Sequence, residues 1–135
     1  MGAGKILVVD DEPSVRELLS EAFGEAGYDV LLAEGGEQAL GILQGENADV
    51  IFLDLKLFGM NGIELCRQIR KDRPLSLIYA MTGWSALFEV EECREAGFDD
   101  YFVKPVATEV LLRAVDEAFE KLNRWKRRYI QPVGK

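Results

Sequence analysis

Three aspartates stand at positions where a packed protein core has no use for a charge. Asp10 and Asp11 directly follow a short apolar run, and Asp54 interrupts the apolar run from 50 to 55. Burying a carboxylate is costly unless the group is paired, hydrogen-bonded or bound to a metal. Asp54 taken alone therefore has two interpretations. It caps a strand by bonding a loop amide, or it is a reactive carboxylate held at the end of that strand.

Brought together, the three carboxylates would suit a cation and a phosphoryl group. Each close pair repels by ~4 kcal/mol at an effective dielectric constant of about 20, so a cluster would raise one pKa or recruit a cation. The candidate ligands are all oxygens and the chain has no histidine, which makes Mg²⁺ the natural ion. A carboxylate can accept a phosphoryl group as aspartyl-phosphate, and Thr82 and Lys104 offer a hydroxyl donor and a positive charge for its oxygens.

The elements that must position these residues alternate regularly along the chain. Apolar runs predict strands at 5–10, 28–32, 49–53, 75–80 and 99–103. Helical spacing of apolar residues predicts helices around 15–23, 39–43, 63–69, 85–95 and 110–122, with a continuation of the last through Tyr129 left open. This alternation predicts an α/β fold of the flavodoxin-like, doubly wound (βα)5 class, with a five-stranded parallel sheet in the order 2-1-3-4-5.

The strand order brings the chemistry-bearing residues to one edge of the sheet. Ligands of such folds bind outside the carboxyl ends of the strands, where the strand order reverses. The first and third strands are neighbours there, so Asp10, Asp11 and Asp54 should meet, and the fourth and fifth strands end at Thr82 and Lys104. Residues that merely cap strands would rarely gather at one edge, so the pattern favours a functional site.

Two other functions share this fold class but fit the sequence less well. A flavin-mononucleotide module would carry a loop rich in Ser, Thr and Gly after the first strand, where this chain has acids. A haloacid-type phosphatase would need a second acid two residues after the nucleophile, where this chain has Lys56, and usually a cap domain.

Composition narrows the class of protein further. The net charge of −8 argues against nucleic-acid binding by the domain, and no apolar run approaches the ~20 residues of a membrane span. Cys66 and Cys93 are too few for a disulfide framework or a zinc site, so we expect reduced, structural thiols. Without a recognisable signal peptide, we expect a cytoplasmic location.

Residues 4–122 closely resemble the receiver domain of two-component response regulators. The resemblance rests on an ordered set of motifs: Val8-Val-Asp-Asp-Glu-Pro13, Asp54 after an apolar strand, Gly59-Met-Asn-Gly62, Thr82, and Asp99-Asp-Tyr-Phe-Val-Lys-Pro105. It implies that Asp54 takes a phosphoryl group from a histidine kinase or a histidine phosphotransfer protein. It also implies that Asp11, Asp54 and the backbone carbonyl of Lys56 bind Mg²⁺, with Asp10 acting largely through water, while Thr82 and Lys104 bind the phosphoryl group.

The resemblance also implies a conformational switch. Thr82 would shift toward the phosphoryl group and Tyr101 would rotate inward to follow it, although Tyr101 also suits a half-buried strand position. The face formed by the fourth helix, fifth strand and fifth helix would then act as a dimer or partner surface. We accordingly expect a signalling module that catalyses only its own phosphorylation and dephosphorylation. The alternative is a Mg²⁺-dependent aspartyl-phosphate phosphatase or phosphotransferase.

Three positions and the C-terminal segment depart from the family pattern or vary within it. Phe58 stands where the family commonly has proline, so it is an exposed apolar contact, a residue tucked against a helix, or a sign of a less rigid loop. Lys56 and Trp84 occupy variable positions that flank the phosphoryl group, and a bulky Trp84 would lengthen its lifetime. Residues 123–135 are predicted as a basic helical extension or linker, and a stand-alone receiver and an excised one both remain open.

Overall fold

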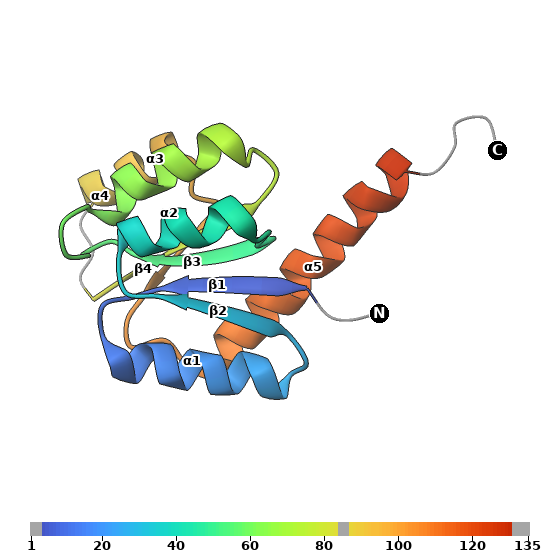
Figure 1. The fold of residues 1–135 in the computed structure, drawn as a ribbon, viewed down its shortest axis with the longest axis horizontal. Coiled ribbons are helices and arrows are strands. Elements are labelled where there is room, and N and C mark those ends of the chain that lie inside the picture. The colour runs from blue at the N-terminus through green and yellow to red at the C-terminus, as the bar shows by residue number, and fades with distance from the viewer. Residues whose placement is uncertain (1–3, 84–86, 131–135) are drawn as a thin grey trace.

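The computed structural model describes residues 4–83 and 87–130, which form one parallel sheet with helices on both faces (Figure 1). The strands are β1 (Lys5–Val9), β2 (Asp29–Ala33), β3 (Val50–Asp54), β4 (Leu77–Thr82) and β5 (Asp100–Val103). They are separated by α1 (Pro13–Glu25), α2 (Gly36–Gly45), α3 (Gly62–Asp72) and α4 (Leu87–Ala96), and α5 (Thr108–Ile130) follows the last strand. All described strand pairs are parallel, in the order β2-β1-β3-β4-β5, which confirms the predicted fold class.

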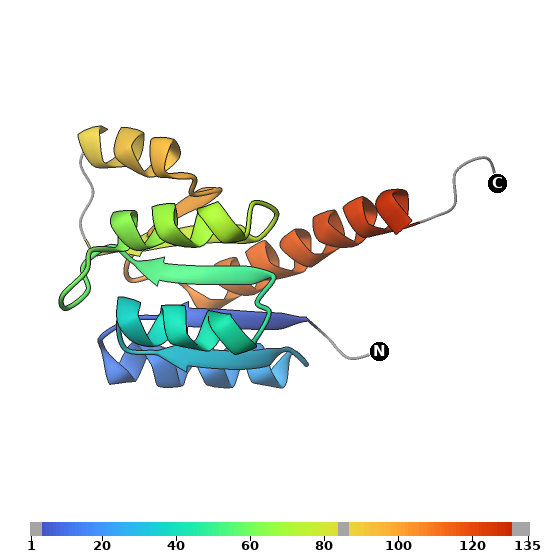
Figure 2. The same cartoon turned by 45° about the horizontal axis from the view of Figure 1, so that its top comes forward.

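The sheet separates two apolar cores, and β3 contributes to both of them. Ile51 and Leu53 pack on the side of α2, α3 and α4, whereas Val50 and Phe52 pack on the side of α1 and α5 (Figures 1 and 2). Successive side chains of a strand point to opposite faces, so a strand covered on both faces has to be apolar throughout. The one carboxylate in β3 is therefore confined to its last position, Asp54.

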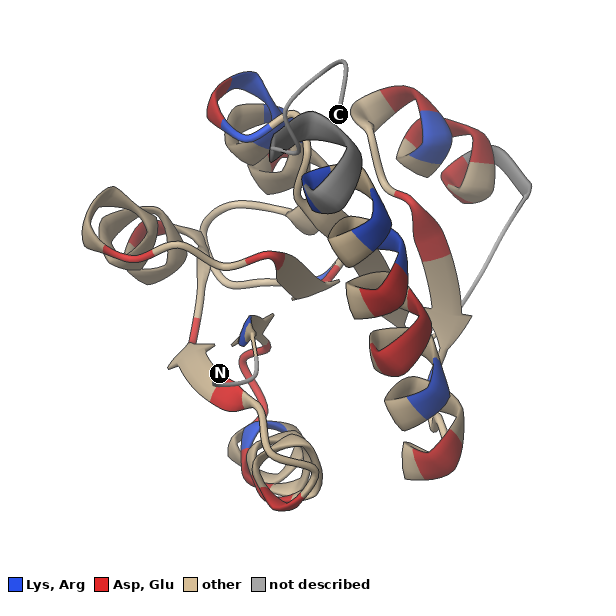
Figure 3. Ribbon diagram, turned by 90° about the vertical axis from the view of Figure 1, so that its right-hand side faces the viewer, with Lys and Arg blue, Asp and Glu red and all other residues tan. Residues whose placement is uncertain are grey.

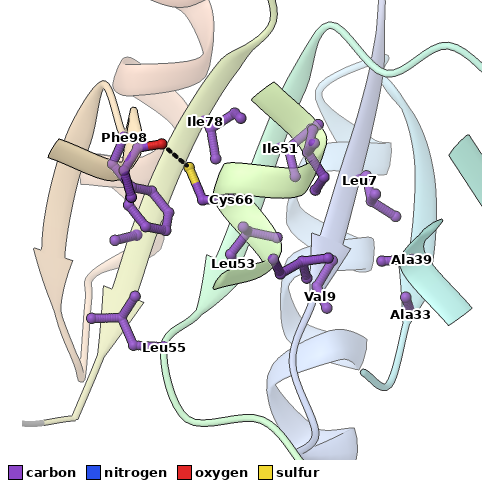
Figure 4. Packing of buried hydrophobic residues seen from close by; sticks show 14 of the residues in the cluster. Leu7, Val9, Ala33, Ala39, Ile51, Leu53, Leu55, Cys66, Ile78 and Phe98 are labelled. Atoms are coloured by element: carbon purple, nitrogen blue, oxygen red, sulfur yellow. Dashed lines mark hydrogen bonds between the residues drawn. The ribbon is translucent and has the colours of Figure 1, made fainter. Parts of the chain in front are cut away.

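The cysteines belong to the first of these cores. Cys66 of α3 is fully buried among residues such as Leu53 and Ile78, and its thiol donates to the Ala96 carbonyl oxygen at 3.6 Å (Figure 4). Burial raises the pKa of Cys66 to about 12 and that of Cys93 to about 11. Both are free thiols in the structure, as expected for structural cysteines.

The fourth strand begins two residues later than the sequence predicted. Leu75 is 78% exposed and lies before β4 rather than within it. The guanidinium of Arg70 accounts for this difference, because its Nη1 donates to the carbonyl oxygens of Pro74 at 3.0 Å and Ser76 at 2.6 Å. Those carbonyls are thereby satisfied without a strand partner.

The last helix continues well beyond the sheet. α5 reaches Ile130 without a break, so the helical continuation left open by the sequence is present. Within the described ranges, no helix is long and apolar enough to cross a membrane.

Candidate functional site

The strand order brings three carboxylates together at the carboxyl edge of the sheet. β1 and β3 are adjacent, with Val9 paired to Leu53, so the residues that follow or end these strands become neighbours. Asp10, Asp11 and Asp54 each offer an oxygen atom, and these atoms lie within 4.8 Å of one another. Asp10 is fully buried and Asp54 is 5% exposed, whereas Asp11 is open to solvent. The predicted gathering of these three residues is therefore present.

Asp54 is held through both of its carboxylate oxygens. Oδ1 accepts the backbone N–H of Lys56 at 3.0 Å, and Oδ2 accepts a hydrogen bond from Lys104 Nζ at 3.0 Å. Burial raises the pKa of Asp54 above its ordinary value, and the nearby charge of Asp10 adds to the rise, while the two hydrogen bonds oppose it. The carboxylate is thus oriented but poorly solvated, as suits a nucleophile rather than a surface cap.

Lys104 directly follows β5, a strand at the edge of the sheet, and its side chain reaches the acids at the ends of β1 and β3. Its Nζ lies 2.8 Å from Asp10 Oδ2 and 3.0 Å from Asp54 Oδ2, and its backbone N–H donates to the Thr82 carbonyl oxygen at 2.6 Å. Burial lowers the pKa of Lys104, but its contacts with the two carboxylates outweigh that effect and raise the pKa above its usual value. The peptide bond between Lys104 and Pro105 is cis. A protonated ammonium therefore sits between two buried acids.

Asp10 is anchored on one side and incompletely satisfied on the other. Its Oδ1 accepts the Glu12 N–H at 2.9 Å, and its main-chain carbonyl oxygen accepts Arg16 Nη1 at 2.6 Å. Its Oδ2 is fully buried, lies 2.8 Å from the Lys104 ammonium and has no well-directed hydrogen bond from the described residues. Such an oxygen has lone pairs left for a cation or for a water bound to one.

Thr82 and Tyr101 lie on the two neighbouring strands beside this cluster. Thr82 is the last residue of β4, is fully buried, and pairs with Val103 of β5. Tyr101 is half-buried in β5, and its hydroxyl donates to Glu89 Oε1 of α4 at 3.3 Å. Tyr101 thus links the strand next to Thr82 with the helix that covers it.

The loop after β3 depends on one glycine. A Cβ on Gly62 would lie 2.8 Å from the Leu55 Cα, so only glycine lets the loop fold back against the strand end. The Gly62 N–H donates to the Leu55 carbonyl oxygen at 2.9 Å, and the Asn61 side chain then caps α3 by accepting the Glu64 N–H. These contacts fix the backbone on which Asp54 and Lys56 are presented.

The three positions near the acids that depart from the family pattern or vary within it have different outcomes. Phe58 is 89% exposed, so the interpretation that it is tucked against a helix is wrong, and its role as an apolar contact stays a prediction. Lys56 is exposed, and it reaches the site through its backbone N–H. Trp84, which we predicted to lengthen the lifetime of the phosphoryl group, lies outside the described residues.

Comparison with known proteins identifies the family. The model of the response regulator receiver domain matches residues 6–116. The chain belongs to this family. The receiver domain is 36% identical to sporulation initiation phosphotransferase F of Bacillus subtilis, covering 82% of this chain and 90% of that protein. It is 42% identical to the alkaline phosphatase synthesis transcriptional regulatory protein PhoP of the same organism, covering 75% of this chain and 42% of PhoP.

The fold comparison agrees with the family. A CheY-like response regulator receiver domain protein from Methanospirillum hungatei superposes with a TM-score of 0.88 at 28% identity, covering 91% of this chain and 98% of the other. Several curated relatives are longer, and this receiver domain spans about half of their length, as with 52% of the probable transcriptional regulator ycf27 of Porphyridium aerugineum. The chain is therefore a two-component receiver domain with the flavodoxin-like topology of its relatives.

The residues of this receiver domain fit a hard divalent cation. The cluster contains oxygen donors from Asp10, Asp11 and Asp54, without the soft thiolate or imidazole ligands that favour zinc or copper. The buried Oδ2 of Asp10 lacks a well-directed hydrogen bond from the described residues, and the exposed Asp11 leaves the cluster open to water. Both features are compatible with a bound cation.

Arg16 also supports the site, and the sequence alone did not identify it. Its guanidinium holds the main-chain oxygen of Asp10, and its side chain is only 15% exposed. The sequence gives one usable signal, an arginine in the first turns of the helix that follows the acids. The direction of the side chain, back over the end of β1, depends on the structure.

Proposed function

We propose that this receiver domain accepts a phosphoryl group on Asp54 from a phosphohistidine of a histidine kinase or a histidine phosphotransfer protein. The observation that carries the proposal is the way Asp54 is held. One oxygen bonds a loop N–H and the other bonds Lys104, at the strand-order reversal where ligands of this fold bind. Residues 1–135 contain no histidine, so the phosphohistidine lies outside this sequence.

The transfer needs few groups from this chain. A carboxylate oxygen of Asp54 bonds to phosphorus while the P–N bond of the phosphohistidine breaks, and the electron pair of that bond stays on the imidazole nitrogen, which takes up a proton. The ammonium of Lys104 lies 3.0 Å from the attacking carboxylate, so its charge is placed to meet the added phosphoryl oxygens. The hydroxyl of Thr82 would bind a second one. Attack by water on phosphorus later releases phosphate and restores the carboxylate.

Asp10, Asp11, Asp54 and the backbone carbonyl of Lys56 would hold Mg²⁺ at this site, with Asp10 acting largely through bound water. When bound, the ion supplies positive charge that offsets the repulsion between the carboxylates and the incoming phosphoryl group. The cluster of three aspartates and the incompletely satisfied Asp10 oxygen support this assignment.

Phosphorylation would be read out through Thr82 and Tyr101. Thr82 moving toward a phosphoryl oxygen leaves room for Tyr101 to turn inward, away from Glu89. Because the phosphoryl group contacts only the shifted arrangement, it favours that arrangement, as a population shift requires. The surface of α4, β5 and α5 would then bind a second receiver or an output partner. We propose that residues 4–122 form the receiver and that 123–135 form a basic helical extension or linker.

A signalling module and a turnover enzyme give different results with one assay. The protein is incubated with Mg²⁺ and phosphoramidate, and its intact mass and the phosphate released are followed together. A receiver gains one phosphoryl group per chain and releases phosphate only at the slow rate of its own dephosphorylation, and Asp54→Asn gains none. Asp29→Asn, at an exposed position in β2, serves as the control and should be phosphorylated normally. Continuous release of many phosphates per chain would instead favour a phosphatase or phosphotransferase.

A further inference from the structure

The end of α5 carries an apolar stripe past the body that buries it. Leu111, Val115, Ala118 and Leu122 recur at spacings of four and three and are buried against the sheet. Trp125 continues the same spacing, yet it is 60% exposed. Figure 1 shows why, since α5 runs on beyond the strands and projects from the domain. The stripe is therefore covered along the sheet and uncovered where the helix leaves it.

A groove lies beside this uncovered segment, at the amino ends of the strands. It has a volume of about 610 Å³ and runs between α5 and the loop that joins α3 to β4. Leu77, Leu122 and Trp125 line it, together with Pro74 and Leu75 from the loop. Leu75 is 78% exposed, so two large apolar side chains stand open to water at one concave surface. Adjacent exposed apolar groups of this kind mark a binding surface more often than isolated ones do.

The charge of the chain divides sharply at the same segment. Residues 121–135 contain six of the 16 Lys and Arg residues and none of the 24 Asp and Glu residues. Residues 1–120 consequently hold 10 positive and 24 negative groups, a net charge of −14. Figure 3 shows the basic residues gathered toward the C-terminal end of α5. Among them, Lys121, Arg124 and Lys126 have exposed side chains.

Two of the three acids that line the groove, Asp49 and Asp99, are engaged within the chain. Asp99 accepts Arg70 Nη2 at 2.9 Å as well as the backbone N–H of Ile78, and Asp49 lies 3.9 Å from Lys126. Three acidic and three basic residues line the groove, so the groove as a whole is charge-balanced, and the other basic residues of 121–135, Arg124 among them, are additional to its lining. An occupant should place an apolar group in the groove and negative groups along the helix.

These features select among possible occupants. Lys121 and Lys126 flank Leu122 and Trp125 directly, so pairing two copies through this stripe would place like charges opposite each other. A nucleic acid or an anionic membrane extends beyond the basic segment and would lie against a body of charge −14, whereas a short acidic peptide can be confined to the segment. We propose that the groove and the basic end of α5 together bind an acidic amphipathic peptide segment of another protein, anchored by a bulky apolar side chain. This site lies at the opposite edge of the sheet from Asp54 and does not depend on phosphorylation.

The test uses the full chain with Trp84→Phe, which leaves Trp125 as the only tryptophan. The probe is a synthetic peptide in which glutamates flank two leucines and one phenylalanine, and a second peptide has glutamine in place of every glutamate. We expect saturable binding of the acidic peptide with a blue shift of Trp125 emission, and at least about tenfold weaker binding of the glutamine peptide. Raising the salt from 0.05 to about 0.5 M should weaken binding by a similar factor.

Variants distinguish peptide binding at this surface from general effects of a substitution on the protein. The triple variant Lys121→Glu, Arg124→Glu, Lys126→Glu should weaken binding at least about tenfold, as should Trp125→Ala, with binding measured by calorimetry for the latter. Arg113→Glu, an exposed charge reversal on the same helix, and Asp54→Asn should each bind within about twofold of the parent. Circular dichroism melts verify that each variant is folded.

Several results would overturn the proposal. These are the absence of saturable binding, equal binding of the glutamine peptide, and unchanged binding by a folded Trp125→Ala. Tighter binding to vesicles containing phosphatidylglycerol or to a short DNA duplex would assign the surface to those ligands instead. Self-association through the same residues, seen by analytical ultracentrifugation and lost in Trp125→Ala, would assign it to a second copy.

Discussion

At the carboxyl ends of the strands two buried acids contact a partly buried lysine, whereas beside the amino ends the described basic residues of α5 lie exposed on a projecting helix. Asp10 and Asp54, whose own side chains are almost inaccessible to solvent, share the ammonium of Lys104 within 3.0 Å. Lys121 and Arg124 instead stand in water on α5. Charges are costly to bury and inexpensive to expose, so only the first arrangement has to be built with accuracy. We therefore expect the chemical step at the buried aspartates and partner recognition at the exposed basic residues of α5.

Replacing Lys104 should have the largest effect on the buried charges at the carboxyl ends of the strands. Replacing it by methionine leaves two buried carboxylates without a positive charge, so we expect the free energy of unfolding at pH 7 to fall by about 3 kcal/mol. Urea denaturation measures the loss, and adding Asp54→Asn to Lys104→Met should restore much of it. Lys71→Met, an exposed change at the end of α3, is the matched control. Equal stabilities of the two methionine variants would mean that the buried charges are not matched by Lys104.

Arg70 is a partly buried charged group at the amino ends of the strands, and replacing it measures how much such a group stabilises the fold there. Its guanidinium satisfies the carbonyl oxygens of Pro74, Ser76 and Gly97 and pairs with Asp99. Arg70→Met should therefore lower the free energy of unfolding by about 2 kcal/mol, because partly buried carbonyls lose their donor. Arg67→Met, one turn away and exposed, should change it by less than about 0.5 kcal/mol. A loss of similar size in both variants would contradict this role.

The pH dependence of stability should reveal the cost of burying Asp54. Its pKa in the folded protein is raised above 3.8, mainly by burial, so the folded state binds this proton more tightly than the unfolded chain does. The associated stability is present at low pH and is lost as the pH rises through the folded-state pKa. Asp54→Asn should thus melt a few degrees higher than the wild type at pH 7, and the difference should shrink toward pH 4. A difference that grows on acidification would show that the pKa is instead lowered.

Phe58 should give the smallest effect, although it stands next to the acids in the sequence. Its side chain is 89% exposed, so Phe58→Ala should change the free energy of unfolding by less than about 0.5 kcal/mol. Phosphorylation by phosphoramidate should proceed at the wild-type rate, measured by mass spectrometry. A destabilisation above about 1 kcal/mol would show that the ring packs against the domain after all.

The contrast between the two edges also explains what the sequence can predict. Asp10, Asp54 and Lys104 end apolar strands, and the strand order of the fold is enough to bring them together. The contact of Arg16 with the Asp10 carbonyl and the bonds of Arg70 to residues up to 29 positions away depend on side-chain direction, which no local pattern specifies. The predicted start of β4 is wrong for the same reason, because Arg70 binds the carbonyl oxygen of Ser76, which the apolar run would assign to the strand. The exposure of Phe58 likewise follows from the path of a loop.

Locating the phosphoryl group after a single phosphorylation tests the central claim most directly. The protein is treated with phosphoramidate and Mg²⁺, the acyl phosphate is reduced with borohydride, and the modified residue is identified by tandem mass spectrometry of its peptides. The account predicts one modified residue, Asp54, converted to homoserine in close to stoichiometric yield. Modification at Asp10 or Asp11 with Asp54 intact, or no modification in a correctly folded protein, would contradict it.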